Sequence, residues 1–533
     1  MVGRRFRISL VARILELAKD EVRAQLSELH ALDFIFPSVQ DAGLAYTFKH
    51  ALTQDVVYGG VLERRRRTYH AAAALGLEEL YAGRIAEGVE LLAHHYARAQ
   101  VWDKAAAYLR QAAVKAQAKS AHREALACLE EALAALRHLP ESAQTREQEI
   151  DVRLELRGSL YPLGEFEKML GYLREAETMA SGISDARRLA VVSIHTAEYL
   201  RQTGRFAEAR TLAEQALALG ERSEDMPLKL YAGHYLGLAC HALGDYRRAC
   251  EALREIVQSP PAGWRPGAIG GMVVGSWDAF QCTTLGWLAR CLAERGELAS
   301  AIEAGRRAVA LAEELGSPYS LAGAYMGLGY SLLVQGDLEA ARAALERACA
   351  IAGEANIMLL RPQATRMLGA AHLAAGRVEE GASLVRAAAD EVESGRLLMQ
   401  QAAVLAMLGE ACFAAGRMED ARNATLRALS LARERGQRGD EAAALRVLGD
   451  IDNAEQHYLA AIALARELEM LPLLARSHLG IAGLYLRTGE RERAGPHLHS
   501  AMCLFAANEM PLWLRQAEAA LGERARGRGF AGG

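Results

Sequence analysis

Apolar residues recur with helical spacing along most of this chain, in long segments rich in alanine and leucine. The alternation of apolar and polar positions that indicates strands is rare after about residue 60. A glycine followed two positions later by an apolar residue interrupts the helical segments, and most of these glycines differ by 40 in their sequence numbers. This spacing indicates an internal repeat. Its glycines are Gly164, Gly204, Gly244, Gly296, Gly336, Gly376 and Gly416, with Gly489 matching apart from Arg491.

Positions around these glycines repeat as well. A small residue stands seven positions before every one of them except the first, and in most units it follows a large aliphatic residue. Five positions after the glycine stands an alanine in all but one of these units. The pattern predicts a helix–turn–helix unit in which the small residue lets two antiparallel helices approach and the glycine ends the first helix. We therefore expect an all-α fold, an α-solenoid of helical hairpins of about 40 residues.

Two steps in the register are irregular. The step from Gly244 to Gly296 is longer than the others and contains an insertion of twelve. The step from Gly416 to Gly489 is one full unit plus one shortened by seven, around Leu448-Gly449, so we expect a short helix pair there. Two degenerate units precede the regular ones, which places degenerate repeats at 71–145 and the main array at 146–258 and 278–521.

Two segments lie outside the repeats. Residues 259–277 are dense in Gly and Pro between Ser259 and Gly275, and both residue types form turns. We expect an insertion loop there, which either packs over a helix seam or contacts a ligand or partner. Residues 522–533 are rich in Gly and Arg and predict a disordered tail.

The N-terminal segment, 1–70, also departs from the repeat. Residues 10–17 and 22–32 predict two amphipathic helices, and an apolar patch at 34–36, a turn at 40–43 and an extended segment at 44–48 follow them. Helix, helix, strand, turn, strand is the order of a winged-helix domain. Because Met1 begins within the first helical element, we expect the N-terminal segment to be only part of such a domain.

Composition and charge exclude several classes of function. The formal net charge is −4, which gives no electrostatic reason to expect a nucleic-acid binder. No lysine follows a glycine, so the G-K-[S/T] sequence of a P-loop ATPase is absent. The sequence contains neither an apolar run long enough to span a membrane nor the apolar core of a signal peptide. The eight cysteines include no C-x-x-C pair, and we expect them to be reduced residues of a cytoplasmic protein.

Motifs for catalysis and metal binding are missing too. The sequence has no G-x-S-x-G, no H-E-x-x-H and no glycine-rich dinucleotide loop after a strand. Four arginines stand in the run 63–67, but such a run is more typical of a solvated face than of a DNA contact. His94-His95 and the pair His497 and His499 lack the spacing of a zinc site. We therefore predict a chain that is not an enzyme and holds no metal or cofactor of its own.

Several stretches carry a family resemblance. The repeat resembles the tetratricopeptide repeat (TPR), whose hallmarks are Leu-Gly in the first helix and two alanines in the second. The stretches V-G-R-R-F at Val2 and Y-T-F-K-H-A-L-T-Q-D-V-V-Y-G at Tyr46 resemble the winged-helix end of a bacterial signal-transduction (STAND) ATPase module. L-L-A-H-H-Y-A-R-A at Leu91 and L-G-D-Y-R-R-A at Leu243 are similar to the repeats of the same proteins. These proteins join a class III adenylate/guanylate cyclase, a STAND ATPase and TPRs, so the resemblance implies their C-terminal region, without the cyclase domain and the P-loop core.

The resemblance also implies one nucleotide-contacting residue. In STAND ATPases a winged-helix histidine similar to His50 contacts the β-phosphate of the nucleotide, and His50 could do so only together with an upstream ATPase core. The alternative for His50 is that it caps or packs the helix that begins at Ala51.

The concave groove of a repeat solenoid is its usual binding surface. By register the first helices carry four candidate residues that either face the groove or belong to the core: Tyr199, Tyr235, Tyr325 and Arg366. We expect a non-catalytic TPR scaffold or sensor that binds a protein partner or a small-molecule inducer there and works with an upstream or separate ATPase/cyclase module. The alternative is a fragment of a LuxR/MalT-like ATP-dependent transcriptional activator that lacks its DNA-binding domain.

Overall fold

The computed structural model describes residues 5–40, 43–119, 121–258 and 277–526. It divides into two compact units, Met1–Ser159 and Leu160–Gly533. The insertion loop expected at 259–277 lies outside the described residues, apart from Trp277, with which a helix begins. Helix α27 (Pro511–Arg526) continues past Gly522, so the expected tail starts inside a helix, and residues 527–533 lie outside the described part.

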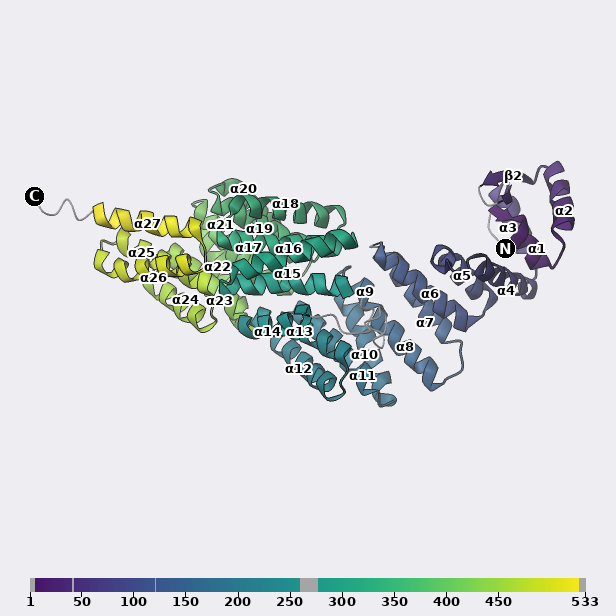
Figure 1. Cartoon of the computed structure of the whole chain (residues 1–533), viewed down its shortest axis with the longest axis horizontal. Helices are drawn as coiled ribbons and strands as arrows, with labels where there is room; N and C mark the ends of the chain where they lie inside the picture. Colours follow the sequence, from purple (N-terminus) through teal and green to yellow (C-terminus); the bar gives the residue numbers. More distant parts are fainter. Residues whose placement is uncertain (1–4, 41–42, 120, 259–276, 527–533) are drawn as a thin grey trace, which may run out of the picture. The chain divides into compact units, whose positions relative to one another are not determined.

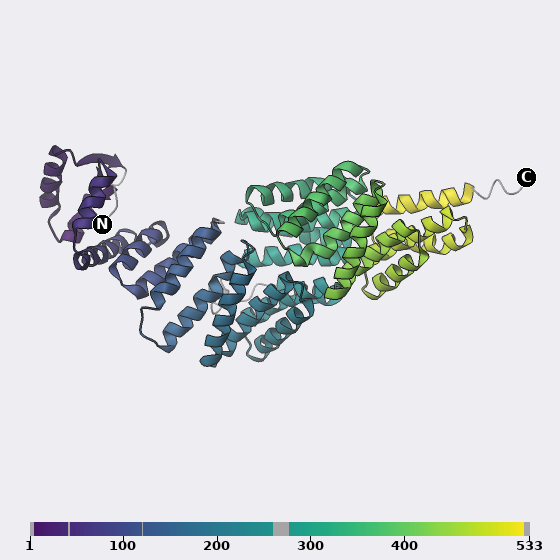
Figure 2. The same cartoon turned by 180° about the vertical axis from the view of Figure 1, so that it is seen from behind.

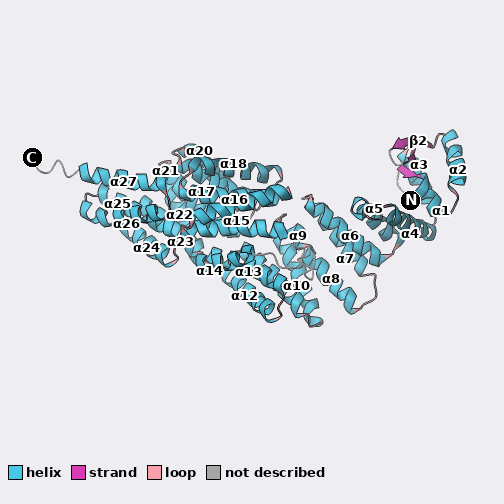
Figure 3. Cartoon of the chain, in the orientation of Figure 1, coloured by secondary structure: helices cyan, strands magenta, loops and turns pink. Residues whose placement is uncertain are grey.

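The first unit begins with a small sheet. Strands β1 (Arg5–Arg7), β2 (Ile35–Gln40) and β3 (Gly43–Phe48) form an antiparallel sheet in the order β1-β3-β2, and helices α1 (Ile8–Leu15) and α2 (Lys19–Ala31) stand between its first two strands in the sequence. Phe6, Ile8, Val22, Ile35 and Tyr46 are buried together in its core. Both expected helices and both expected extended segments are present, and these are the only strands in the described chain (Figure 3).

One element of this sheet differs from the expectation. Residues 5–7 form a strand, whereas the sequence pattern places Met1 within the first helical element. Phe6 is buried between the exposed Arg5 and the half-buried Arg7, and the strand exists because it pairs with Tyr46 and its neighbours on β3. A segment this short cannot show an alternating pattern. The identification of this region as a winged helix stays a prediction.

Helices make up the rest of the first unit. Helix α3 buries none of its side chains, and its Leu52 and Val56 are exposed, as is Leu62 directly after it. From α4 to α7 each helix packs against its successor. The bounds are α3 (Ala51–Gly60), α4 (Glu63–Leu80), α5 (Ile85–Ala99), α6 (Trp102–Ala118), α7 (His122–Leu136), α8 (Ala143–Glu155) and α9 (Arg157–Leu160), the last of which spans the boundary.

The second unit is an α-solenoid, which confirms the expected fold class. Successive helices pack as antiparallel pairs, and the pairs stack side by side (Figures 1 and 2). The bounds are α10 (Phe166–Gly182), α11 (Ala186–Gln202), α12 (Phe206–Arg222), α13 (Met226–Leu243), α14 (Tyr246–Gln258), α15 (Trp277–Arg295), α16 (Leu298–Leu315), α17 (Pro318–Gln335), α18 (Leu338–Glu354), α19 (Arg361–Ala374), α20 (Val378–Ser394), the 3₁₀ turn η1 (Leu398–Gln400), α21 (Gln401–Ala414), α22 (Met418–Arg435), α23 (Arg438–Asp452), α24 (Glu455–Glu467), α25 (Leu471–Arg487), α26 (Arg491–Ala507) and α27.

The repeat glycines end the first helix of each pair, as the register predicts. All eight have a positive φ, from 71° at Gly164 to 98° at Gly336. A left-handed residue breaks the helical hydrogen-bond pattern, and glycine adopts this conformation without a steric penalty from a Cβ atom. The sequence register is therefore the register of the helical hairpins.

The small residue seven positions earlier marks the point where the two helices of a pair touch. A Cβ atom on Gly329 would lie 2.6 Å from Cγ of Leu345, and one on Gly369 would lie 2.6 Å from Cγ2 of Val385. In both pairs the partner stands 16 positions after the glycine. The glycine thus makes room for a large buried side chain of the second helix.

The shortened unit keeps this contact with fewer residues. Gly449 packs against Tyr458, nine positions later, so the seven missing residues come from the turn between the contacts. Asn453 takes the left-handed conformation there, with φ 48°, in place of a glycine. Helix α24 is shorter than its counterpart α20 by more than one helical turn, so the second helix of the expected short pair is confirmed. The first helix, α23, is not shorter than α19 or α21.

The solenoid of the second unit closes on itself after one superhelical turn. The Trp513 indole on α27 donates a hydrogen bond to the backbone oxygen of Val334 on α17 at 3.1 Å. Arg295, at the end of α15, forms an ion pair of 3.1 Å with Glu469. The partners of each contact are separated by several repeats in the sequence, and the first helices of distant repeats line a common space.

Candidate functional site

That common space is a cavity of about 480 Å³. Its walls come mainly from the first helices of the repeats, α13, α15, α17, α19, α21, α23 and α25, with α27 and the end of α11. The volume lies in the range of pockets that hold small organic ligands or short peptide segments.

One stripe of each first helix faces the cavity. Relative to the repeat glycine, the lining residues stand at positions −2 or −3, −6, −9 or −10, and −13, and this spacing of three and four marks a single helix face. The unit that ends at Gly376 contributes Gln363, Arg366, Met367, Ala370, Leu373 and Ala374, and the unit that ends at Gly416 contributes Ala403, Ala406, Met407, Glu410 and Ala414.

Three charged side chains on this lining form what we name the paired cluster: Glu410, Arg446 and Arg476. An oxygen of Glu410 lies 2.7 Å from the Arg446 guanidinium and 2.8 Å from that of Arg476. Arg446 also pairs with Asp450 at 2.7 Å, and Arg476 stacks over the Trp513 ring. Burial raises the pKa of Glu410, but the two guanidinium groups outweigh it and lower the pKa to about 2. Every charge of this cluster has a direct partner.

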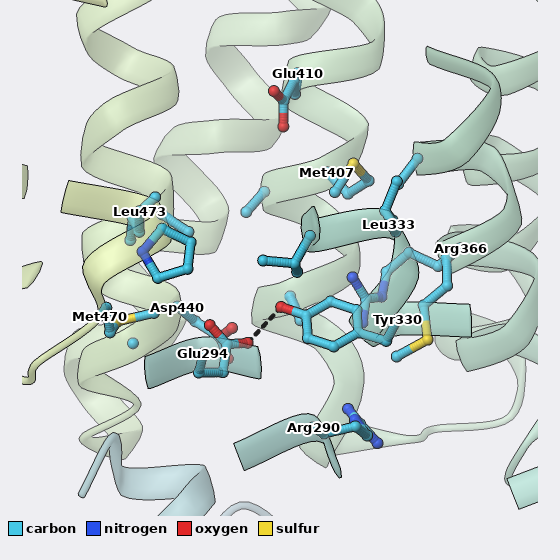
Figure 4. Close-up of a pocket in the computed structure, with 18 of the residues that line it drawn as sticks. Arg290, Glu294, Tyr330, Leu333, Arg366, Met407, Glu410, Asp440, Met470 and Leu473 are labelled. Carbon is cyan, nitrogen blue, oxygen red and sulfur yellow. Dashed lines mark hydrogen bonds between the residues drawn. The ribbon is translucent and has the colours of Figure 1, made fainter. Parts of the chain in front are cut away.

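Four other charged side chains form what we name the open cluster: Arg290, Arg366, Glu294 and Asp440. Figure 4 shows Arg290, Glu294 and Asp440 at one end of the cavity, away from Glu410. Within the described part of the chain none of the four has an oppositely charged group within 4.0 Å. The open cluster thus places both signs of charge in the cavity without direct ion pairs.

The arginines of the open cluster are poorly satisfied. Arg290 stacks over Trp287 at 4.3 Å and donates one hydrogen bond to Gln363, at 3.2 Å, while its buried Nε has no acceptor. Burial lowers the pKa of Arg290 to about 10, and the nearby charge of Arg366 acts in the same direction. The side chain of Arg366 makes no hydrogen bond or ion pair with the residues that the structure describes.

The acids of the open cluster have neutral partners. Glu294 accepts a hydrogen bond of 2.5 Å from the Tyr330 hydroxyl (Figure 4), and Asp440 accepts one of 2.7 Å from the Gln437 amide. Burial raises the pKa of Glu294, and it raises the pKa of Asp440 to about 6 although Arg366 and Arg290 oppose the shift. Both carboxyl groups therefore lack a cation at contact distance.

Of the four groove candidates from the sequence, the structure places Arg366 on the cavity wall. The three tyrosines lie elsewhere. Tyr199 donates to Glu167 at 3.1 Å and Tyr325 to Glu313 at 2.9 Å, both on second helices, and Tyr235 is buried beside His234 and Tyr231. Tyr199 and Tyr325 stand five and eleven positions before their glycines, which are off the cavity stripe.

His50 is exposed at the start of α3. Its backbone is extended and its side chain makes no capping hydrogen bond to the helix. Of the alternatives open from the sequence, capping is therefore not realised in the structure, and a phosphate contact stays a prediction.

Sequence reasoning missed the acids on the cavity lining and every lining arginine except Arg366. The signal was present, because charged residues at fixed distances before the repeat glycine interrupt helices that are otherwise rich in Ala, Leu and Gly. Arg290 and Glu410 each stand six positions before their glycine, and Glu294 stands two before. A solenoid helix packs on two sides, so a charged residue in such a segment indicates the third, concave side.

The described residues include no group of three or more His, Cys, Asp or Glu side chains placed to hold a metal ion. No helix of the described chain is long and apolar enough to cross a membrane.

Known proteins match both the repeats and the fold. Family models described as tetratricopeptide repeat match residues 196–263 and 280–354, so the chain contains TPRs. No curated protein sequence matches the chain. A crystal structure of a Rap protein complexed with competence and sporulation factor is 12% identical, with a TM-score of 0.50, and the match covers 71% of this chain and 99% of that one. At this identity the likeness shows the fold alone, a TPR-like α-solenoid.

Two further solved structures are similar over most of this chain. The Cut9–Hcn1 hetero-tetramer of the APC/C is 17% identical with a TM-score of 0.46, and the match covers 96% of this chain and 98% of that one. A STAND protein with a tetratricopeptide repeat sensor from Pyrococcus horikoshii is 13% identical with a TM-score of 0.36, and the match covers 97% of this chain and 73% of that one.

Proposed function

We propose that this TPR scaffold is a sensor that binds a small molecule or a short peptide segment inside the second unit. The observation that carries the proposal is the charged cavity of about 480 Å³, whose lining is drawn from one stripe of successive repeats. Scattered polar groups on an otherwise apolar concave surface are typical of ligand pockets. The Rap protein with a similar fold is complexed with competence and sporulation factor, which supports a ligand-bound solenoid as the working state.

Binding can be coupled to shape because the cavity is bounded by a closed superhelical turn. Its width depends on contacts between distant repeats, such as Trp513 with Val334 and Arg295 with Glu469. A ligand that contacts α15, α19 and α23 at once favours one superhelical pitch over others. The change in pitch is then the signal that a partner protein detects.

The sensor is proposed to act within a bacterial cytoplasmic signalling protein of the cyclase–STAND ATPase–TPR type, and the chain itself is proposed not to be an enzyme. The exposed apolar side chains Leu52, Val56 and Leu62 support an interaction of the first unit with another module. Mixing the chain with a STAND ATPase fragment and measuring nucleotide retention tests this context. Retention that falls when His50 is changed to Ala supports the phosphate contact, and equal retention contradicts it.

Cavity-filling variants test the sensor function directly. Ala403 and Ala443 line the cavity outside the packed core clusters, whereas Ala299 is exposed on α16 and serves as the matched control. The probe is 1-anilinonaphthalene-8-sulfonate, whose rings and anionic group suit the Trp287, Met407 and arginine lining. We expect Ala403→Phe and Ala443→Phe each to lose one bound probe per chain in a fluorescence titration, and Ala299→Phe to retain it. Equal probe binding by all three variants and the unchanged chain would contradict a ligand-binding cavity.

A further inference from the structure

The open cluster contains as many positive as negative side chains, but the opposite charges do not contact one another. Two arginines, Arg290 and Arg366, and two carboxylic acids, Glu294 and Asp440, line one cavity on α15, α19 and α23. In the described part of the chain no oxygen of these acids lies within 4.0 Å of an arginine or lysine nitrogen. The cavity thus holds both cations and anions that do not contact one another and that a ligand can contact separately.

Isolated buried charges are costly, and folded proteins usually pair them directly. The paired cluster in the same cavity does so, since Glu410 contacts two arginines. A ligand that carries both a cation and an anion can pair with the acids and with the arginines of the open cluster, and so offsets the desolvation cost of both.

We propose that the cavity binds a small zwitterion, a free amino acid or a short peptide with both ends unblocked. Its carboxylate is held by Arg290 and Arg366, and its ammonium group by Glu294 and Asp440. This inference rests on the proposed sensor function and names the chemical class of its ligand.

The local chemistry agrees with each half. The Arg290 side chain donates one hydrogen bond, to Gln363, and a guanidinium can bind a carboxylate through two parallel hydrogen bonds. Burial holds the pKa of Asp440 and Glu294 above the ordinary values, and an ammonium group beside them would favour their charged forms.

The remaining lining suits the rest of such a molecule. Leu333, Met407 and Leu473 project into the cavity among the charged residues (Figure 4), so apolar side chains of a ligand find contact there. Methionine adapts to side chains of different shape. A volume of about 480 Å³ holds an amino acid or a peptide of a few residues rather than a folded partner.

The experiment compares four forms of the same probe by isothermal titration and thermal shift on the full chain. The probes are a mixture of synthetic tripeptides of Ala, Leu, Met and Phe with free ends, the same mixture N-acetylated, the same mixture C-amidated, and the mixture blocked at both ends. The twenty free amino acids form a separate arm, which distinguishes the two sources of the zwitterion. Succinate and putrescine serve as the anion-only and cation-only controls.

We expect unblocked tripeptides or amino acids to bind, and each block to weaken binding by about tenfold or more, because each removes charge-assisted hydrogen bonds. Arg366→Gln should reduce the ratio of affinities between the carboxylate and amide forms of the probe, and Arg290 accounts for what remains of it. Asp440→Asn should in the same way reduce the ratio between the ammonium and acetyl forms, with Glu294 accounting for the remainder. Arg342→Gln, at a half-buried position of α18 away from the cavity, is the matched control and should preserve both differences. These ratios are measured within one variant, so a change in its stability does not affect them.

Equal binding of blocked and unblocked probes overturns the proposal, as does succinate or putrescine binding as tightly as the best zwitterion. Absence of binding by every peptide and amino acid also overturns it. In that case the naphthalene sulfonate titration separates the two failures: if the cavity variants still lose that probe, the sensor function stands and only the zwitterion fails.

Discussion

The two charged clusters of the cavity both combine arginines with carboxylic acids, but only the paired cluster joins them in direct ion pairs. In the paired cluster, Glu410 contacts both Arg446 and Arg476, and its pKa is lowered to about 2. In the open cluster, Asp440 has no cation at contact distance in the described chain, and its pKa is raised to about 6. Burial acts in the same direction on both carboxyl groups, so the difference comes from direct guanidinium contacts. The paired cluster therefore holds repeats together, whereas the open cluster leaves its charges available to a ligand.

Removing the shared carboxylate of the paired cluster should have the largest effect on stability. Glu410→Ala leaves Arg446 and Arg476 close together without their common anion, and we expect the free energy of unfolding to fall by about 3–5 kcal/mol. Urea denaturation followed by circular dichroism measures the change. If Glu410→Ala were as stable as the unchanged chain, the cluster would not be structural.

The two acids should give opposite pH dependence. The folded pKa of Glu410 lies below its ordinary 4.5, so its contribution is complete above pH 4.5 and is lost as the pH falls toward 2. The folded pKa of Asp440 lies above its ordinary 3.8, so stability is lost as the pH rises from about 4 through 6. Asp440→Asn should therefore stabilise the protein by about 1–3 kcal/mol at pH 8 and have little effect near pH 3.5. Denaturation curves at the two pH values check the sign, and a loss of stability at pH 8 would contradict it.

Removing one arginine of the open cluster should have the smallest effect. Arg366 makes no ion pair with the described residues, so Arg366→Met should change the free energy of unfolding by less than about 1 kcal/mol. Arg342→Met, at a half-buried position outside the cavity, loses only its ion pairs with Glu339 and Glu346, whose side chains are largely exposed. It is the matched control and should change the free energy of unfolding by a similarly small amount. A loss above about 2 kcal/mol for Arg366→Met in urea denaturation would assign Arg366 a structural role and remove the contrast between the clusters.

Much of the fold follows from local sequence rules. A left-handed glycine must end the first helix, and a small residue must stand where the paired helices touch, so Gly336 and Gly329 repeat at fixed spacing in one unit after another. The helix contact of the shortened unit also follows from these rules, since Gly449 still packs against Tyr458 although the unit has seven residues fewer. The short strand at 5–7 does not follow, because only its pairing with β3 makes it a strand.

The candidate site follows only in part. Arg366 was identified as a groove candidate from the register of its helix, and it lines the cavity, whereas Tyr199 and Tyr325 reach second helices instead. The position relative to the glycine explains Tyr199 and Tyr325 but not Tyr235, which stands nine before Gly244 and yet does not line the cavity. A single repeat does not reveal which helix face is concave. The cavity-facing side of a first helix is defined only when several first helices stack in one superhelix.

By itself the sequence determined the helical hairpins, their boundaries and their order, because turns and helix contacts act over tens of residues. The tertiary structure alone decided that the superhelix closes, through contacts such as that between Trp513 and Val334, which are separated by several repeats in the sequence. It also decided which charges meet across the cavity, so that Glu410 is paired and Asp440 is not. Small rotations between successive repeats add up over a whole superhelical turn, and the total rotation cannot be predicted from the sequence pattern of a single repeat.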